Sequence, residues 1–98
     1  MTEVLIELVD YVKLAVDIER WTIAGGGELH ADCEAVLLND GSLQQNIWGA
    51  DWIPLLQEVR YQSFINIRPS QHNPSMEILD PNIRERVNTV VRAIFEGV

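Results

Sequence analysis

The sequence predicts an α+β fold: a four-stranded antiparallel meander with a C-terminal helix packed on one face. Several short segments alternate apolar and polar residues, which is the period of half-buried strands. Glycine-containing turn signals separate these segments, and the final segment repeats its apolar residues at helical spacing instead. With 98 residues and neither a repeat nor a linker, the chain is expected to form one domain, 1–98.

The first strand is expected at residues 11–24. Leu14, Val16 and Ile18 fall on one side of an alternating pattern, and charged residues are among those on the other side. Three consecutive glycines at 25–27 then end the strand, because glycine permits almost any tight reversal. Residues 3–9, which precede this strand, fit a short helix and a strand extension equally well.

A hairpin is expected to follow, formed by strands at 28–38 and 43–53. The segment 28–38 alternates cleanly, with its acidic residues on one side and its small or apolar residues on the other. Between the two segments, Asp40 and Gly41 predict a tight hairpin turn, since Asp-Gly readily adopts the positive φ angles of a type I′ loop.

The remaining elements are a fourth strand, an irregular connection and the C-terminal helix. β-Branched and aromatic residues at 59–67 predict the strand, and residues 68–79 have the composition of a connection. Asp80 is a good N-cap, and Pro81 suits the first helical position. Apolar residues then recur at helical spacing as far as Phe95, so one face of this helix is expected to pack on the sheet.

The composition is that of a folded chain that stays in water. Hydrophobic residues make up 47% of the chain, and no run of about 18 apolar residues could span a membrane. The first residues carry acids among their apolar side chains and lack the basic start of a signal peptide. The single cysteine, Cys33, falls on the apolar side of its segment and is expected to be a core residue. We therefore expect a cytoplasmic protein.

Charge is distributed unevenly along the chain. Residues 1–58 carry eleven acidic and two basic residues, a balance of −9, whereas residues 59–98 carry five basic and four acidic residues, a balance of +1. Such a field repels nucleic acid and anionic membranes, and it attracts cations or a basic protein partner. Neither nucleic acid nor a membrane is therefore an expected partner.

The predicted hairpin brings several carboxylates together. A turn at Asp40 and Gly41 places His30 opposite Asp51, and the carboxylates of neighbouring strands then share one face. Clustered carboxylate and amide oxygens suit Ca²⁺, which takes about six to eight oxygen ligands in a flexible shell. The candidate calcium ligands are Asp32, Glu34, Asp51, Asp17, Glu19, Asn39 and Asp40.

Other interpretations of these residues stay open. No EF-hand loop occurs, and the same acids could form an ordinary solvated face neutralised by arginines. They could also dock a basic partner, which would make the chain an acidic protein-interaction module without a specific metal site. No serine or cysteine has the neighbours of a catalytic nucleophile, so enzymatic activity is not expected. Trp21, Trp48 and Trp52 are expected in the core or at its rim, and an exposed pair at Trp48 and Trp52 would instead mark a partner surface.

Several stretches carry a resemblance: A-V-D-I-E-R from Ala15, then G-G-E-L-H-A-D-C-E, L-L-N-D-G-S, W-G-A-D-W and I-N-I-R-P-S-Q. The chain resembles a family of short bacterial proteins, and within it the small acidic calcium-binding proteins of heterocyst-forming cyanobacteria. The resemblance covers most of the chain. It implies a non-EF-hand cytoplasmic protein that buffers or senses Ca²⁺ and affects calcium signalling in cell differentiation.

The resemblance assigns no role to four polar residues of the connection, Asn66, Arg68, Gln71 and Asn73. Asparagine and similar side chains readily hydrogen-bond nearby backbone groups in irregular segments. We therefore expect these residues to hold the connection in place, the alternative being a binding site.

Overall fold

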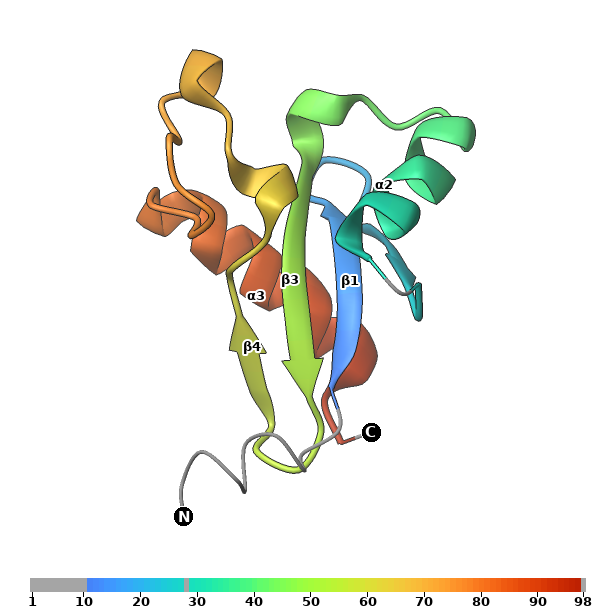
Figure 1. Cartoon of the computed structure of the whole chain (residues 1–98). Helices are drawn as coiled ribbons and strands as arrows, with labels where there is room; N and C mark the ends of the chain where they lie inside the picture. The colour runs from blue at the N-terminus through green and yellow to red at the C-terminus, as the bar shows by residue number, and fades with distance from the viewer. Residues whose placement is uncertain (1–10, 28, 98) are drawn as a thin grey trace.

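A computed structural model of the chain describes residues 11–27 and 29–97. It contains a four-stranded antiparallel sheet with the strand order β2-β1-β3-β4 (Figure 1). The strands and helices are β1 (Val12–Asp17), β2 (Thr22–Gly25), α2 (His30–Asn39), β3 (Ile47–Ile53), β4 (Glu58–Arg60) and α3 (Pro81–Phe95). The predicted α+β fold, with its four antiparallel strands and its C-terminal helix, is confirmed.

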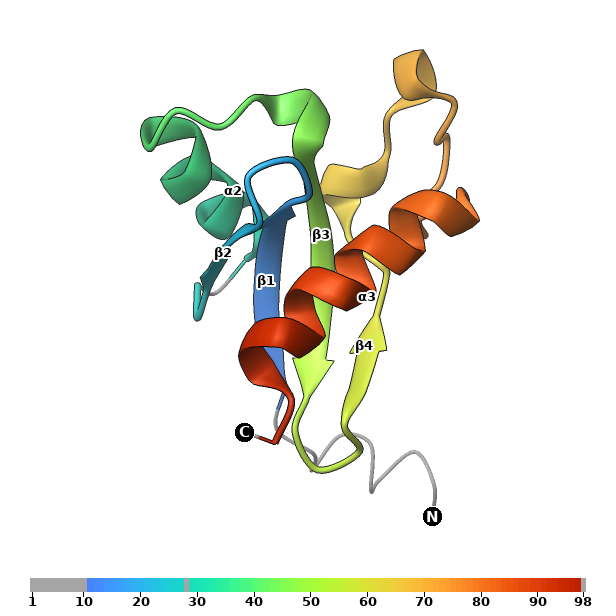
Figure 2. The same cartoon turned by 180° about the vertical axis from the view of Figure 1, so that it is seen from behind.

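The two helices lie on opposite faces of the sheet, as Figures 1 and 2 show. Because side chains alternate along a strand, each face has its own core. The larger core lies under α3 and contains Leu14, Val16, Ile18, Trp48, Ala50, Trp52, Ile78, Val87, Val90 and Val91. The smaller core lies under α2 and contains Ala15, Ala24, Cys33, Leu37 and Ile47. Trp48, Trp52 and Cys33 are therefore core residues, as expected, whereas Trp21 is 57% exposed and the same expectation was wrong for it.

Helix α3 forms as its sequence predicts. The Asp80 side chain accepts a hydrogen bond from the Asn82 N–H at 2.8 Å, and Pro81 occupies the first turn. Val87 and Val91 are both fully buried and lie four residues apart, so they share the face that packs on the sheet.

The segment predicted as the first strand is in fact a hairpin of β1 and β2. The Asp17 side chain stabilises the turn between the two strands. Its Oδ1 accepts hydrogen bonds from the backbone N–H groups of Glu19 and Arg20 at 2.9 and 3.0 Å. Trp21 follows with a φ of 54°, which reverses the chain before β2. The one long strand was a wrong prediction because this side-chain turn was not recognised in the sequence.

The predicted strand at 28–38 and its hairpin turn are also wrong, because residues 30–39 form helix α2. Gly41 has a φ of 96°, and it ends the helix instead of turning a hairpin. The N–H of Ser42 bonds the carbonyl of Leu37, and the N–H of Gly41 bonds that of Leu38, which is the Schellman pattern. A glycine with positive φ serves both kinds of turn, so the sequence alone did not distinguish them.

The last two predicted strands are shorter than expected. Residues 44–46 form a 3₁₀ turn before β3 begins, and β4 contains only three residues. After β4 the chain leaves the sheet and forms a connection at 61–79 that includes 3₁₀ turns at Phe64–Asn66 and Pro69–Gln71. The undecided segment 3–9 lies outside the described residues.

A side-chain amide closes the sheet where β4 stops. Gly49 lies on β3 beyond the reach of this short strand. The fully buried Asn66 takes the place of the missing strand: its Oδ1 accepts from the Gly49 N–H at 2.7 Å, and its Nδ2 donates to the Gly49 carbonyl at 3.0 Å. The same Nδ2 lies within hydrogen-bond distance of the Tyr61 and Met76 carbonyls. The backbone groups of Gly49 are thereby satisfied without a further strand.

Arg68 lies beneath the same connection and is 8% exposed. Its guanidinium donates to three backbone carbonyls, those of Gln44, Ile47 and Ile65. It also lies 4.6 Å from the centroid of the Trp48 ring and 3.5 Å from the Glu34 carboxylate. Burial lowers the pKa of Arg68, and the neighbouring Glu34 acts in the opposite direction.

Asn73 completes the arrangement. Its Nδ2 donates to the Asn66, Ser75 and Glu77 carbonyls, its Oδ1 accepts from the Leu79 N–H, and Gln71 donates to the Gln45 carbonyl. The expected role of these four polar residues, holding the connection by side-chain-to-backbone hydrogen bonds, is confirmed.

Candidate functional site

The candidate calcium ligands on α2 are engaged in local interactions. The Asp32 carboxylate accepts a hydrogen bond from the Leu29 N–H at 3.1 Å and so caps the first turn of the helix. Glu34 points instead toward the buried Arg68, its Oε2 being 3.5 Å from the guanidinium. The two acids serve different neighbours and do not converge.

Asp51 on β3 pairs with His30, as the sequence predicted, although His30 comes from a helix and not from a facing strand. His30 Nε2 lies 2.8 Å from Asp51 Oδ1 and 3.1 Å from the Ala50 carbonyl. Both neighbours are acceptors, so Nε2 carries the hydrogen. Lys13 is paired with Asp51 across β1 and β3. His30 and Asp51 both line a hollow of about 330 Å³, and the exposed Phe64 forms another part of its wall.

The other candidate ligands lie at the opposite end of β1 and near the end of α2. Glu19 pairs with Arg86 at 2.7 Å, and Asp40 pairs with Arg20 at 3.0 Å. Asn39 is exposed on the last turn of α2. Asp17 is fully buried, and its Oδ2 has no hydrogen-bond partner among the described residues.

These positions do not form a carboxylate cluster. Within residues 11–27 and 29–97, no three His, Cys, Asp or Glu side chains are placed to share a metal ion. The predicted face was derived from a hairpin that the chain does not form, and that is why its members separate. Calcium binding itself stays a prediction.

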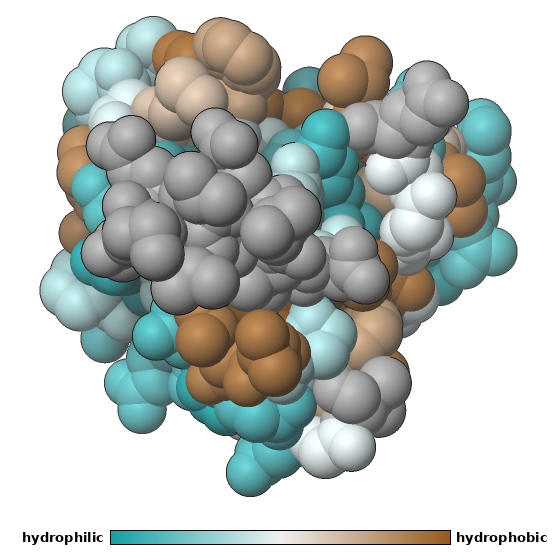
Figure 3. Space-filling view, turned by 60° about the horizontal axis from the view of Figure 1, so that its bottom comes forward, coloured by the Kyte–Doolittle hydropathy of each residue, from teal (hydrophilic) through white to brown (hydrophobic). Residues whose placement is uncertain are grey.

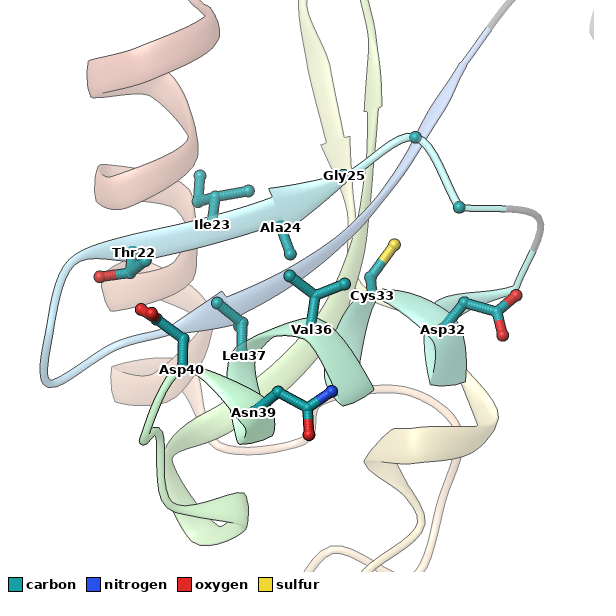
Figure 4. A pocket seen from close by; sticks show the side chains of 12 residues that line it. Thr22, Ile23, Ala24, Gly25, Asp32, Cys33, Val36, Leu37, Asn39 and Asp40 are labelled. Carbon is teal, nitrogen blue, oxygen red and sulfur yellow. The ribbon is translucent and has the colours of Figure 1, made fainter.

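A groove lies between β2 and α2 (Figure 4). Its volume is about 630 Å³. Its lining comes from the strand, from the glycines that follow it and from one side of the helix: Thr22, Ile23, Ala24, Gly25, Gly26, Gly27, Asp32, Cys33, Val36, Leu37, Asn39 and Asp40. Strand and helix therefore form two walls of one elongated hollow.

The floor of the groove is apolar. Ala24, Cys33 and Leu37 are buried at its base, and Figure 4 shows the latter two pointing from α2 toward the strand. Val36, one residue before Leu37, is 59% exposed and stands on the helical wall. Apolar surface of this kind inside a hollow is typical of a binding site.

The charge of the groove has one sign. Among the described residues that line it, Asp32 and Asp40 are the only acidic ones, and none is a lysine, an arginine or a histidine. Figure 4 places Asp40 near Thr22 and Asp32 near the glycine segment, so the two acids mark opposite ends. Arg20 reaches Asp40 from outside the groove and bonds its Oδ2. The groove therefore combines an apolar floor with acidic ends.

Sequence reasoning missed this groove because it placed residues 28–38 in a strand. Cys33 and Leu37 are four residues apart, which is helical spacing, and Gly41 suits a helix C-terminus. Both signals also fit a strand that ends in a hairpin turn, so they did not identify α2 or the wall that carries Val36.

Apolar side chains elsewhere reach the surface in separate patches with polar ones between them, as Figure 3 shows for one face. Leu55 and Phe64 are 76% and 77% exposed, respectively. In the part of the chain that the structure describes, no helix is long and apolar enough to cross a membrane.

Residues 1–94 match the model of a protein family described as a protein of unknown function (DUF5674), and the chain belongs to that family. No curated protein and no solved structure matches the chain significantly.

Proposed function

We propose that this member of the family is an acidic protein-interaction module that works in the cytoplasm. Its partner is a basic segment of another protein, and the groove between β2 and α2 is the docking site. The observation that carries the proposal is the groove itself, whose floor is apolar and whose ionised lining residues are both acidic.

The two properties of the groove have different consequences for binding. Covering the exposed Val36 removes hydrophobic surface from water, which favours association with many partners. The acids select among these partners, because a basic segment is attracted to the groove and an acidic one is repelled. The −9 balance of residues 1–58 acts in the same direction over a longer range.

A displayed library of random dodecapeptides, selected against the immobilised chain at about 0.15 M salt, tests the proposal. We expect enriched peptides that combine basic and apolar residues. Replacing Val36 by lysine should weaken their binding at least about tenfold, because it fills the groove and adds a like charge. Ala35→Lys is the matched control, since Ala35 is exposed on the same helix but does not line the groove.

Two results would oppose the proposal. One is a selection that enriches no peptide above the uncoated support. The other is a set of peptides whose affinity falls equally in the Val36→Lys and Ala35→Lys variants, because charge alone and not the groove would then determine binding.

Calcium buffering or sensing is the second candidate function. The specific observation in its favour is Asp17, whose fully buried Oδ2 has no hydrogen-bond partner among the described residues. An unpartnered buried carboxylate oxygen is costly, and a cation would satisfy it. The resemblance to acidic calcium-binding proteins supports the same function.

Calorimetric titration with Ca²⁺ and Mg²⁺ at about 0.15 M salt tests this second function. Saturable Ca²⁺ binding that Mg²⁺ does not compete away supports it, and Asp17→Asn should abolish the binding while keeping the Oδ1 acceptor of the turn. If the heat of Ca²⁺ binding disappears with added salt, the ions form only a diffuse counterion atmosphere and do not occupy a specific site. Unchanged binding in Asp17→Asn would show that another residue holds the ion.

A further inference from the structure

The outer edge of β2 carries backbone groups that no described residue pairs. In an antiparallel pair, residues alternate between those that bond the partner strand and those that point away from it. The Gly26 N–H bonds the Lys13 carbonyl at 3.2 Å, so in this register Ala24 also bonds β1. Ile23 and Gly25 then direct their N–H and C=O groups toward the open edge.

The edge strand is short, at four residues, but its side chains do not protect it against strand pairing. Exposed edge strands normally carry charges, proline or a bulge that prevents another strand from adding. Residues 22–27 read T-I-A-G-G-G and contain no charge and no proline. This is an uncharged interval within the acidic half of the chain.

The groove lies directly along this edge, because Thr22, Ile23, Ala24 and Gly25 all line it. A strand added to β2 would project alternate side chains over α2, beside Val36. Asp32 lies in the first turn of α2 and Asp40 is its C-cap eight residues later, which corresponds to a rise of about 12 Å along the helix. Two strand residues four positions apart span about 13 Å. Basic residues at that spacing therefore match Asp32 and the Asp40 carboxylate, which is 66% exposed beside its partner Arg20.

We propose that the basic segment binds as an additional β-strand on the edge of β2, with its alternate side chains in the groove. This inference rests on the proposed function and specifies how the partner binds. A second copy of this chain fits less well, because its own acidic groove would face Asp32 and Asp40. Main-chain hydrogen bonds would supply affinity, and the groove would select side chains.

The probe is a synthetic peptide with blocked ends and the sequence Thr-Lys-Thr-Val-Thr-Lys-Thr. Its two lysines are four positions apart, and its valine lies between them on the same side of a strand. The sequence reads identically in both directions, so the same side chains face the groove whether the added strand runs parallel or antiparallel to β2. The comparison peptide has glutamates in place of both lysines.

N-Methylation of the peptide tests strand addition directly. Only alternate N–H groups of an added strand point toward β2, so methyl groups on one alternate set of residues should weaken binding at least about tenfold. Methyl groups on the other set should change it less than about twofold, and which set is sensitive reports the strand direction. Affinities are measured by NMR titration of the isotope-labelled full chain, with Val36→Lys and Ala35→Lys in parallel.

The outcomes separate the two proposals. Strand addition is overturned if both methylated sets bind like the parent peptide, or if both are weakened equally, or if the parent peptide does not bind. The proposed function survives these results when library peptides still require the groove. If library peptides ignore Val36→Lys as well, both proposals fail. Equal binding of the lysine and glutamate peptides would refute the charge match with Asp32 and Asp40.

Discussion

The two edges of the sheet differ in whether the backbone groups that no strand pairs find other hydrogen-bond partners. Where β4 stops, the buried Asn66 supplies both hydrogen bonds that Gly49 needs. The edge strand β4 itself carries two charged residues, Glu58 and Arg60. At the other end, β2 carries no charge, and its outer backbone groups have no described partner.

This difference shows that the chain has the means to close an edge and does not use them at β2. The closed end depends on polar residues that are buried among backbone carbonyls, and such residues are costly unless every partner is present. The open end lies beside a groove and presents ordinary strand geometry. The comparison therefore predicts large stability effects at the closed end, and effects on binding at the open end.

Asn66→Ala should produce the largest loss of stability. It removes both bonds to the buried Gly49 backbone and a second donor from the Tyr61 and Met76 carbonyls, for a loss of about 4 kcal/mol in the free energy of unfolding. Urea denaturation measures the change. Asn82→Ala, at an exposed position on α3, is the matched control and should cost less than about 0.5 kcal/mol. Similar midpoints for the two variants would contradict the closed edge.

Arg68→Met should produce the next largest effect, a loss of about 3 kcal/mol in the free energy of unfolding. The substitution keeps apolar contact with Trp48 but leaves Glu34 and three carbonyls without the guanidinium. Arg60→Met is the comparison, because the side chain of Arg60 is 44% exposed and its pair with Glu58 is long, at 3.9 Å. That surface pair should contribute less than about 1 kcal/mol. The same urea midpoints decide, and equal losses would mean that burial of Arg68 has no energetic consequence.

Gly49→Ala and Gly25→Ala compare the two ends with one substitution. A Cβ at Gly49 would lie 2.5 Å from the Ser63 Cβ, which is fixed to the backbone of the connection. A Cβ at Gly25 would meet the end of the Leu14 side chain at 2.7 Å, and this end can rotate away. We expect Gly49→Ala to cost about 2 kcal/mol more than Gly25→Ala in thermal or urea unfolding. The reverse order would show that the connection yields more easily than the open edge.

Tyr61 should give the smallest effect, in alkaline solution. Burial raises the pKa of Tyr61, while Arg84 and Arg92 act to lower it. The folded state therefore keeps this phenol protonated at a pH where the unfolded chain has lost the proton. Its contribution to stability is complete below the ordinary tyrosine pKa of about 10 and falls as the pH rises toward the raised value.

Melting temperatures between about pH 8 and 11 test this dependence. Tyr61→Phe should make the alkaline decline shallower, because the variant has no phenol to ionise at this position. Tyr11→Phe, at a 54% exposed residue, should leave the decline unchanged. Identical declines in both variants would show that ionisation of Tyr61 does not contribute to the alkaline loss of stability.

The sequence predicted the parts of the fold that local chemistry determines. Helix α3 follows from the Asp80 cap, Pro81 and the spacing of its valines, and the core of β1 follows from alternation. Helix α2 was missed because its ten residues bury only Cys33 and Leu37. These two residues are four positions apart, and residues at that spacing share one face in a strand as well as in a helix.

The candidate site was less predictable, because a single misassigned element changes every neighbour. Asp51 and His30 meet as predicted, but Glu34 joins Arg68 and Asp40 joins Arg20 once α2 replaces a strand. The groove depends on two elements that were both misread, β2 and α2. Asn66 and Asn73 were correctly expected to bind backbone groups, since asparagine in an irregular segment commonly does so.

Amide hydrogen exchange at Gly49 and Ile23 distinguishes a closed sheet edge from an open one, because both amides belong to one sheet and point away from β1. In the free chain, we expect Gly49 to exchange at least about a hundredfold more slowly than Ile23, since Asn66 covers the first and nothing described covers the second. Saturation with the lysine peptide should slow exchange at Ile23 and Gly25 and leave Gly49 unchanged. Equal protection of Gly49 and Ile23 in the free chain, or an Ile23 amide that the bound peptide does not protect, would contradict an open edge that accepts a strand.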